Sequence, residues 1–298
     1  MNKFIFTASV CVAFFFAACG DDSSLITEPS DESSSSVVKS SSSTATKKSS
    51  SSSSVKSSSS TKVSSSSNKV ESSSSAKASS SSTNTPLSSW SGGEPEAIGS
   101  ITDTRDGQTY KTVKIGAQTW MAENLNYETT DSYCYNDSAE YCEKYGRLYT
   151  WAAAMDSAGT WSSNGKGCGY EKTCTPTYPV RGVCPEGWHL PTEAEFDTLF
   201  TAVGGLFTGK VLKSTSGWVE NGNGTDDYSF SALPAGYRGY NGRFCNEGRN
   251  AYFWSSTENY RYNYRAYYMY LDYHNEYADL DDDFRKFGES SVRCVKDE

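Results

Sequence analysis

Beyond about residue 97, hydrophobic and polar residues alternate over short stretches separated by glycines, which is typical of β-strands joined by turns. The first such pair predicts a hairpin, with strands at Tyr110–Ile115 and Gln118–Met121 around the turn Gly116-Ala117. Further strands are expected at residues 253–256, 264–273 and 291–295.

Helical spacing occurs in two places. Thr192 can cap a helix and Glu195 completes a capping box with it, after which apolar residues recur at helical spacing until Gly204-Gly205. These apolar residues are Phe196, Leu199, Phe200 and Val203. A second helix is expected at about Leu148–Met155. Residues 97–298 are therefore predicted to form one α+β domain with long connections.

The first residues of the chain have the features of an export signal. Lys3 precedes an apolar run, Phe4–Ala18, that is too short for a stable transmembrane helix. Phe16-Ala17-Ala18-Cys19 resembles a bacterial lipoprotein cleavage box, in which Cys19 takes the lipid. We expect a signal peptide at residues 1–18 and a lipid anchor at Cys19, with cleavage after Ala18 without lipid as the alternative. Gly20-Asp21-Asp22 resembles a surface-export signal, so the expected location is the outer membrane, exposed at the cell surface.

Residues 19–96 are predicted to be a disordered, Ser-rich spacer behind this anchor. Residues 30–89 hold 33 serines and no cysteine or aromatic residue, so no burial offsets the entropy of ordering them. Because lysines outnumber acids there, contact with anionic lipid or wall polymer is an alternative role, and the hydroxyls are possible glycosylation sites.

Composition after residue 97 excludes two further classes. All 21 tyrosines lie there, which excludes a disordered chain. The same residues carry 19 Lys and Arg against 28 Asp and Glu. Because this negative balance repels phosphate backbones, we expect no nucleic-acid partner.

The domain contains seven cysteines, which indicates an oxidising compartment. Three disulfides are predicted. Short loops favour Cys134 with Cys142 and Cys168 with Cys174. Cys184 is paired with Cys294 because these residues lie beside segments expected on neighbouring strands. Cys245 is then expected to be free. Zinc binding or reduced core cysteines is the alternative, but the chain has no CxxC motif and only two histidines.

Five ordered motifs of the domain resemble one family, the Fibrobacter succinogenes major paralogous domain. They are Gly116–Leu125, Gly146–Met155, Cys184–Phe196, Phe253–Glu258 and Ser291–Asp297. The resemblance spans about residues 100–297. It implies a secreted or lipid-anchored bacterial protein and brings no assigned activity.

A more distant resemblance links Leu190–Phe196 and the closing Val-Arg-Cys strand to the formylglycine-generating sulfatase-modifying fold, which is C-type-lectin-like. It implies two helices, a twisted antiparallel sheet whose terminal strands meet, and long functional loops. The enzymes of that group hold copper with two closely spaced cysteines. Here Cys245 and Cys294 are 49 residues apart, so oxidase activity is not expected.

Acidic residues and histidines offer little catalytic chemistry. Glu193 and Glu195 are two positions apart on a helix and so point to different faces, which disfavours a glycosidase pair. Asp226-Asp227 and Asp279–Asp283 are read as solvated loops, with calcium binding as the alternative, although neither matches an EF-hand. His189 is expected to be buried and bonded to backbone.

The remaining candidate is the tyrosine-rich run from residue 260 to 273. Its first half alternates rings with polar groups that suit sugar binding: Tyr260, Arg261, Tyr262, Asn263, Tyr264 and Arg265. The three tyrosines are expected on one side of an extended segment, and packing in a sheet is the alternative for the run.

We therefore expect a lipoprotein that displays a non-catalytic binding domain with no cofactor, and a polysaccharide or a surface protein as its partner. A structural surface protein without a small ligand is the main alternative.

Overall fold

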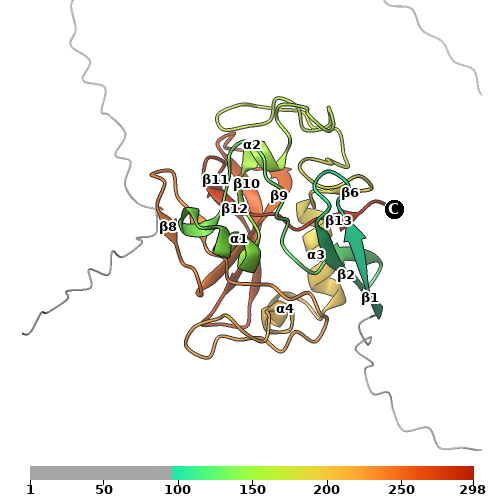
Figure 1. Ribbon diagram of the computed structural model, residues 1–298, viewed down its shortest axis with the longest axis vertical. Coiled ribbons are helices and arrows are strands. Elements are labelled where there is room, and N and C mark those ends of the chain that lie inside the picture. The colour runs from blue at the N-terminus through green and yellow to red at the C-terminus, as the bar shows by residue number, and fades with distance from the viewer. Residues whose placement is uncertain (1–95) are drawn as a thin grey trace, which may run out of the picture. The chain divides into compact units, whose positions relative to one another are not determined.

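The computed structural model of the protein describes residues 96–298 (Figure 1). The predicted signal peptide, Cys19 and the serine spacer lie outside these residues. Within the described part, no helix is long and apolar enough to cross a membrane.

Thirteen strands are present in the described residues. They are β1 Glu96–Thr102, β2 Thr109–Ile115, β3 Gln118–Met121, β4 Ser132–Tyr133, β5 Leu148–Thr150, β6 Trp188–His189, β7 Tyr237–Arg238, β8 Phe244–Cys245, β9 Asn250–Glu258, β10 Arg265–Asp272, β11 Ala278–Arg285, β12 Glu289–Ser291 and β13 Val295–Lys296.

The helices are short and are fewer than the strands. They are the α-helices α1 Ala139–Tyr145, α2 Trp151–Ala154, α3 Glu193–Ala202 and α4 Gly209–Leu212, and the 3-10 turns η1 Tyr135–Asp137 and η2 Leu206–Thr208. The content is mixed but mostly sheet, so the predicted α+β class holds, with more helices than the two expected.

The strands form two curled sheets. The first has the order β1-β2-β3-β13-β6, so the C-terminal strand joins the N-terminal hairpin. The second runs β11-β10-β9-β12-β5-β4, with β7 attached to β12 and β8 attached to β7. Neighbours are antiparallel except β9 and β12, which pair in parallel at Phe253 and Ser291.

The main helix fills the space between the two sheets. Thr192 caps α3 and forms the predicted capping box with Glu195. One side of α3 packs on the first sheet (Figure 1). There Phe196 stacks on Trp120, with ring centroids 5.4 Å apart. The same buried cluster includes Phe253 of β9 and Met269 of β10. Burial of these apolar faces from water is the main stabilising contribution of this layer.

Three expectations about single elements are wrong. Leu148–Thr150 is strand, because its backbone pairs with β12, and the helix begins only at Trp151. Asp279–Asp283 lies in β11 rather than in a loop. The closing segment 291–295 is divided between β12 and β13, so that the chain crosses from the second sheet to the first through residues that are fully buried.

Disulfides fix several of the long connections. The structure contains the three predicted bridges, Cys134–Cys142, Cys168–Cys174 and Cys184–Cys294. Cys245 is disulfide-bonded as well, so the expectation of a free thiol at this position is wrong. Of the three predicted bridges, Cys184–Cys294 joins distant parts of the sequence, with a separation of 110 residues.

Candidate functional site

The candidate binding residues lie in the loop between β9 and β10, at residues 259–264. Asn259 is buried and holds this loop: its Oδ1 accepts the backbone N–H groups of Arg261 and Tyr262 at 2.8 and 2.9 Å. Its Nδ2 donates to the carbonyl of Asp282 on β11 at 2.9 Å. Side-chain bonds of this kind close a turn, so the segment is not extended as expected.

The turn separates the three predicted tyrosines. Tyr260 is 74% exposed and Tyr262 is 45% exposed, whereas Tyr264 is partly buried. Tyr262 and Tyr264 still lie together, with ring centroids 5.5 Å apart. The ring of Tyr260 lies instead under the guanidinium of Arg261, 4.9 Å from its carbon.

Tyr264 and Tyr262 form the end of a row of five aromatic rings, which we call the aromatic row. Its members in order are Tyr240, Phe287, Tyr170, Tyr264 and Tyr262. Successive ring centroids are separated by 5.5, 4.6, 6.5 and 5.5 Å. All five side chains are at least partly exposed. Rings from four separate segments of the chain thus make one accessible apolar band.

Sequence reasoning found only two rings of this row. Tyr170, Tyr240 and Phe287 come from three other segments, and each stands beside a glycine: Gly169, Gly239 and Gly288. An aromatic residue next to a glycine in a predicted turn is the signal that could have identified them, because such a side chain has no place in a strand core.

A polar pocket of about 410 Å³ adjoins the loop. It is lined by Thr173, Glu258, Asn259, Tyr260, Arg261 and Asn263. The only carboxylate of this lining, Glu258, forms an ion pair with Lys286. The Lys286 side chain is fully buried and its Nζ lies 4.1 Å from the ring centroid of Trp151, and burial lowers its pKa. Besides Asn259, which holds the loop, the pocket offers the hydrogen-bonding groups of Thr173, Arg261 and Asn263, and its carboxylate is already paired with Lys286.

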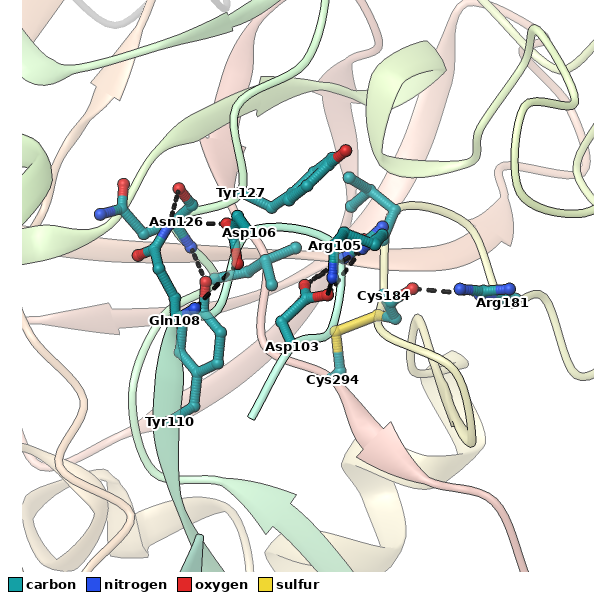
Figure 2. Close-up of polar contacts among 12 residues, drawn as sticks. Asp103, Arg105, Asp106, Gln108, Tyr110, Asn126, Tyr127, Arg181, Cys184 and Cys294 are labelled. Atoms are coloured by element: carbon teal, nitrogen blue, oxygen red, sulfur yellow. Dashed lines mark hydrogen bonds and ion pairs between the residues drawn. A yellow bond between two sulfur atoms is a disulfide. The ribbon is translucent and has the colours of Figure 1, made fainter. Parts of the chain in front are cut away.

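A second polar pocket, of about 480 Å³, was not found from the sequence. Its lining residues are Arg105, Asp106, Gln108, Asn126, Tyr127, Glu128, Cys134, Ala139, Cys142, Glu143 and Arg147. Figure 2 shows the Asp103 carboxylate facing Arg105 beside the Cys184–Cys294 disulfide, with an Nη2 to Oδ2 distance of 2.6 Å. Arg105 also donates to the carbonyl of Val183 at 2.8 Å.

The contacts of Arg105 mainly stabilise the fold. Burial alone would raise the pKa of Asp103, but the hydrogen bonds and charge of Arg105 lower it below its usual value. The guanidinium carbon also lies 3.8 Å from the ring centroid of Tyr127. Because these contacts tie the turn between β1 and β2 to the Cys184 segment, the pair has a structural role at the wall of the pocket.

His189 is held between two carboxylates. His189 is buried, and its Nδ1 and Nε2 lie 2.6 Å from Asp297 and 2.7 Å from Glu195. Its partners are thus carboxylates rather than backbone, contrary to expectation. Burial alone would lower the pKa of His189, but the two carboxylates raise it overall. Glu195 is occupied by this contact and by the helix cap, which leaves no carboxylate pair with Glu193.

The acidic stretches do not converge on a cation site. Asp226 accepts hydrogen bonds from the backbone and hydroxyl of Ser231 at 2.7 and 2.6 Å. Asp279, Asp281 and Asp283 of β11 lie at alternate, exposed positions of the strand, and Asp282 points to the other face. Among residues 96–298, no group of three or more His, Cys, Asp or Glu side chains is placed to hold a metal ion.

Comparison with known proteins gives a family assignment. A family model described as the Fibrobacter succinogenes major domain matches residues 113–296. No curated protein and no solved structure matches the chain.

Proposed function

The chain belongs to the Fibrobacter succinogenes major domain family, and we propose that it is a cell-envelope lipoprotein whose domain binds carbohydrate without catalysis. Cys19 would carry the lipid and the serine-rich residues would hold the domain away from the outer membrane, exposed at the cell surface. The domain itself would be a distant variant of the C-type-lectin-like fold, in which long loops carry the binding residues. The joining of the C-terminal strand to the N-terminal hairpin supports this fold.

The observation that carries the proposal is the aromatic row beside a polar pocket. Flat, accessible phenol faces stack on the apolar faces of sugar rings, and Tyr side chains lose little entropy when they do so. The adjoining Asn263 and Arg261 supply the donors and acceptors that sugar hydroxyls need. A row of rings, rather than one ring, suits a polymer with repeated units.

An oxidase is disfavoured for a chemical reason. Copper in the enzymes that the chain distantly resembles is held by two thiolates, but Cys294 is buried in a disulfide with Cys184 and supplies none. A disulfide sulfur carries no thiolate charge.

A structural surface protein without a small ligand is the second candidate. One observation favours it: rings of the row contact each other in tilted or edge-on geometry, as they also do in protein cores. Under this alternative the row would serve only to pack four loops together.

Binding to insoluble glucans and xylans separates the two candidates. The mature protein is compared with the triple variant Tyr260→Ala, Tyr262→Ala, Tyr264→Ala. We expect the variant to lose affinity by about tenfold or more, as removal of buried aromatic contacts typically does.

The matched control is the double variant Phe207→Ala, Tyr277→Ala. These two exposed rings contact each other with centroids 5.1 Å apart but belong to other connections of the chain. Their removal is expected to leave binding unchanged. If no glycan retains the unmodified protein, the structural alternative replaces the binding function.

A further inference from the structure

Two arginines lie at the aromatic row, and a third lies in the loop next to it. Arg265 of β10 and Arg285 of β11 are directly opposite each other in the sheet, and Arg261 lies in the adjoining loop. Like charges at directly opposite positions of neighbouring strands destabilise a sheet. The Arg265–Arg285 pair is therefore expected to destabilise the domain, so a contribution to stability does not explain why both residues are arginine.

The aromatic rings hold these guanidinium groups in place. The guanidinium carbon of Arg265 lies 5.2 Å from the ring centroid of Tyr262 and 5.5 Å from that of Tyr264. That of Arg285 lies 6.0 Å from Tyr264 and 5.8 Å from Phe287. Such contacts favour a cation over a ring without neutralising its charge.

No carboxylate of residues 96–298 forms an ion pair with Arg261, Arg265 or Arg285 in the structure. Other arginines of the domain do have such partners, and the shortest nitrogen to oxygen distances are 2.6 Å for Arg105 with Asp103, 2.8 Å for Arg147 with Glu128, and 2.9 Å for Arg238 with Glu289. The Nε of Arg265 is buried and has no hydrogen-bond partner in the structure. Arg105 and Arg238 also have one such nitrogen each, so what distinguishes Arg261, Arg265 and Arg285 is the lack of an acidic partner.

Acids also lie close to this site, with Glu171 beside Tyr170 and Asp283 two residues before Arg285, but among residues 96–298 neither forms an ion pair with the three arginines. Glu258 lines the adjoining pocket but is already paired with Lys286. The whole chain has a net charge of −9, so a polyanion is not attracted to the protein in general. The three arginines are a local cationic site on an acidic protein.

We propose that the aromatic row and these arginines select negatively charged polysaccharides, with uronic acid units as the ligand class. This inference rests on the proposed carbohydrate binding and specifies it. The rings stack on the sugars, while the planar guanidinium groups bind carboxylates through paired N–H donors. The carboxylate would also relieve the repulsion between Arg265 and Arg285.

The experiment measures binding of the mature full chain to polygalacturonate and to a neutral xylan at low and high salt. The double variant Arg261→Gln, Arg285→Gln removes two of the charges. Arg249→Gln is the matched control, since Arg249 also lies over a tyrosine, 5.0 Å from the ring centroid of Tyr273, but is within 3.5 Å of Glu220. Arg249 immediately precedes β9, whereas the loop follows the other end of that strand.

We expect polygalacturonate to bind at least about tenfold more tightly than the xylan, and the double variant to lose this preference. Added salt should weaken binding of polygalacturonate and leave the xylan unaffected. Arg249→Gln should behave as the unmodified protein. If the double variant does not fold, two measurements replace it. They are the polymer preference of the single loop variant Arg261→Gln and the salt dependence of binding by the unmodified protein.

Equal affinity for both polymers, with loss only in the tyrosine variant, would overturn the charge selectivity and leave carbohydrate binding intact. Absence of binding to polygalacturonate would overturn the inference, and absence of binding to any glycan, the insoluble glucans included, would overturn both proposals. Tighter binding to single-stranded poly-dT than to polygalacturonate would also contradict the inference, because stacked rings and arginines can hold bases as well. A sulfated polymer that outcompetes polygalacturonate would show that uronates are not the preferred anions.

Discussion

Buried charged side chains are the most sensitive single residues of this domain. Arg293 is fully buried, and its Nη2 donates to Asn124 Oδ1 at 2.6 Å. Its guanidinium also bonds the carbonyl of Phe230 and lies 4.4 Å from that ring's centroid. Burial is the main cause that lowers the pKa of Arg293 to about 9. The cation is thus held by neutral acceptors at the point where the chain crosses between the sheets.

Replacing Arg293 by Ala is expected to lower the free energy of unfolding by about 3 kcal/mol or more. The reason is that the change leaves buried acceptors without donors and creates a cavity. Urea unfolding measures the effect. Arg243→Ala, an exposed site, is the control and should change stability by less than about 0.5 kcal/mol. A similar small change at residue 293 would contradict the structural role of the guanidinium.

His189 should make stability depend on pH above neutrality. Its pKa in the folded protein is raised above the usual 6.5, since the two carboxylates outweigh burial. The stabilisation from the charged ring is therefore complete below about pH 6.5 and is lost as the pH rises through the raised pKa.

The difference in unfolding free energy between the unmodified protein and His189→Gln tests this dependence. It should be larger at about pH 5.5 than at about pH 8.5. A difference that is equal at both values, or larger at the higher one, would show that the ring is neutral in the folded state.

At the scale of elements, the disulfides differ in what they constrain. Cys184–Cys294 links residues 110 apart and joins the β6 and β13 segments, whereas Cys168–Cys174 closes a loop of separation 6. A cross-link that closes a longer loop removes more entropy from the unfolded chain.

Removing Cys184–Cys294 with the double variant Cys184→Ala, Cys294→Ala should therefore cost about 4 to 5 kcal/mol of unfolding free energy. The corresponding loss for Cys168→Ala, Cys174→Ala should be clearly smaller. Thermal unfolding of both variants under oxidising conditions shows which loss of stability is larger. A larger loss for the Cys168–Cys174 variant would mean that native contacts, rather than loop length, determine how much each disulfide stabilises the protein.

Elements determined by local sequence could be predicted, and those determined by distant partners could not. The capping box of Thr192 and Glu195 identifies α3 because its hydrogen bonds lie within four residues. Leu148–Thr150 has the composition of the helix that follows it, but pairing with β12, more than 130 residues later, makes it a strand. The acidic composition of Asp279–Asp283 predicts a loop, but the segment is a strand whose alternate positions face the solvent.

The same distinction applies to the candidate site. Tyr262, Tyr264 and Arg265 are close in sequence, so their grouping was visible as a pattern. Tyr170 and Phe287 join them only because the fold brings the segments after Cys168 and after β11 to the same end of the second sheet.

For the whole molecule, charge distribution and topology both bear on function. The chain carries a net charge of −9, yet cationic groups without acidic partners among the described residues gather at one loop cluster. The two sheets share a C-terminal segment, since β12 belongs to one and β13 to the other. A rigid scaffold of this kind positions loops from distant segments, which is what a binding face on loops requires.

Hydrogen exchange with and without a bound oligogalacturonide tests the location of this face most directly. Slowed exchange is predicted for the backbone amides of residues 259–265, with further protection at 170–173 and 285–287. Protection confined to the pocket lined by Arg105 and Asn126, or none in the loop between β9 and β10, would contradict the account.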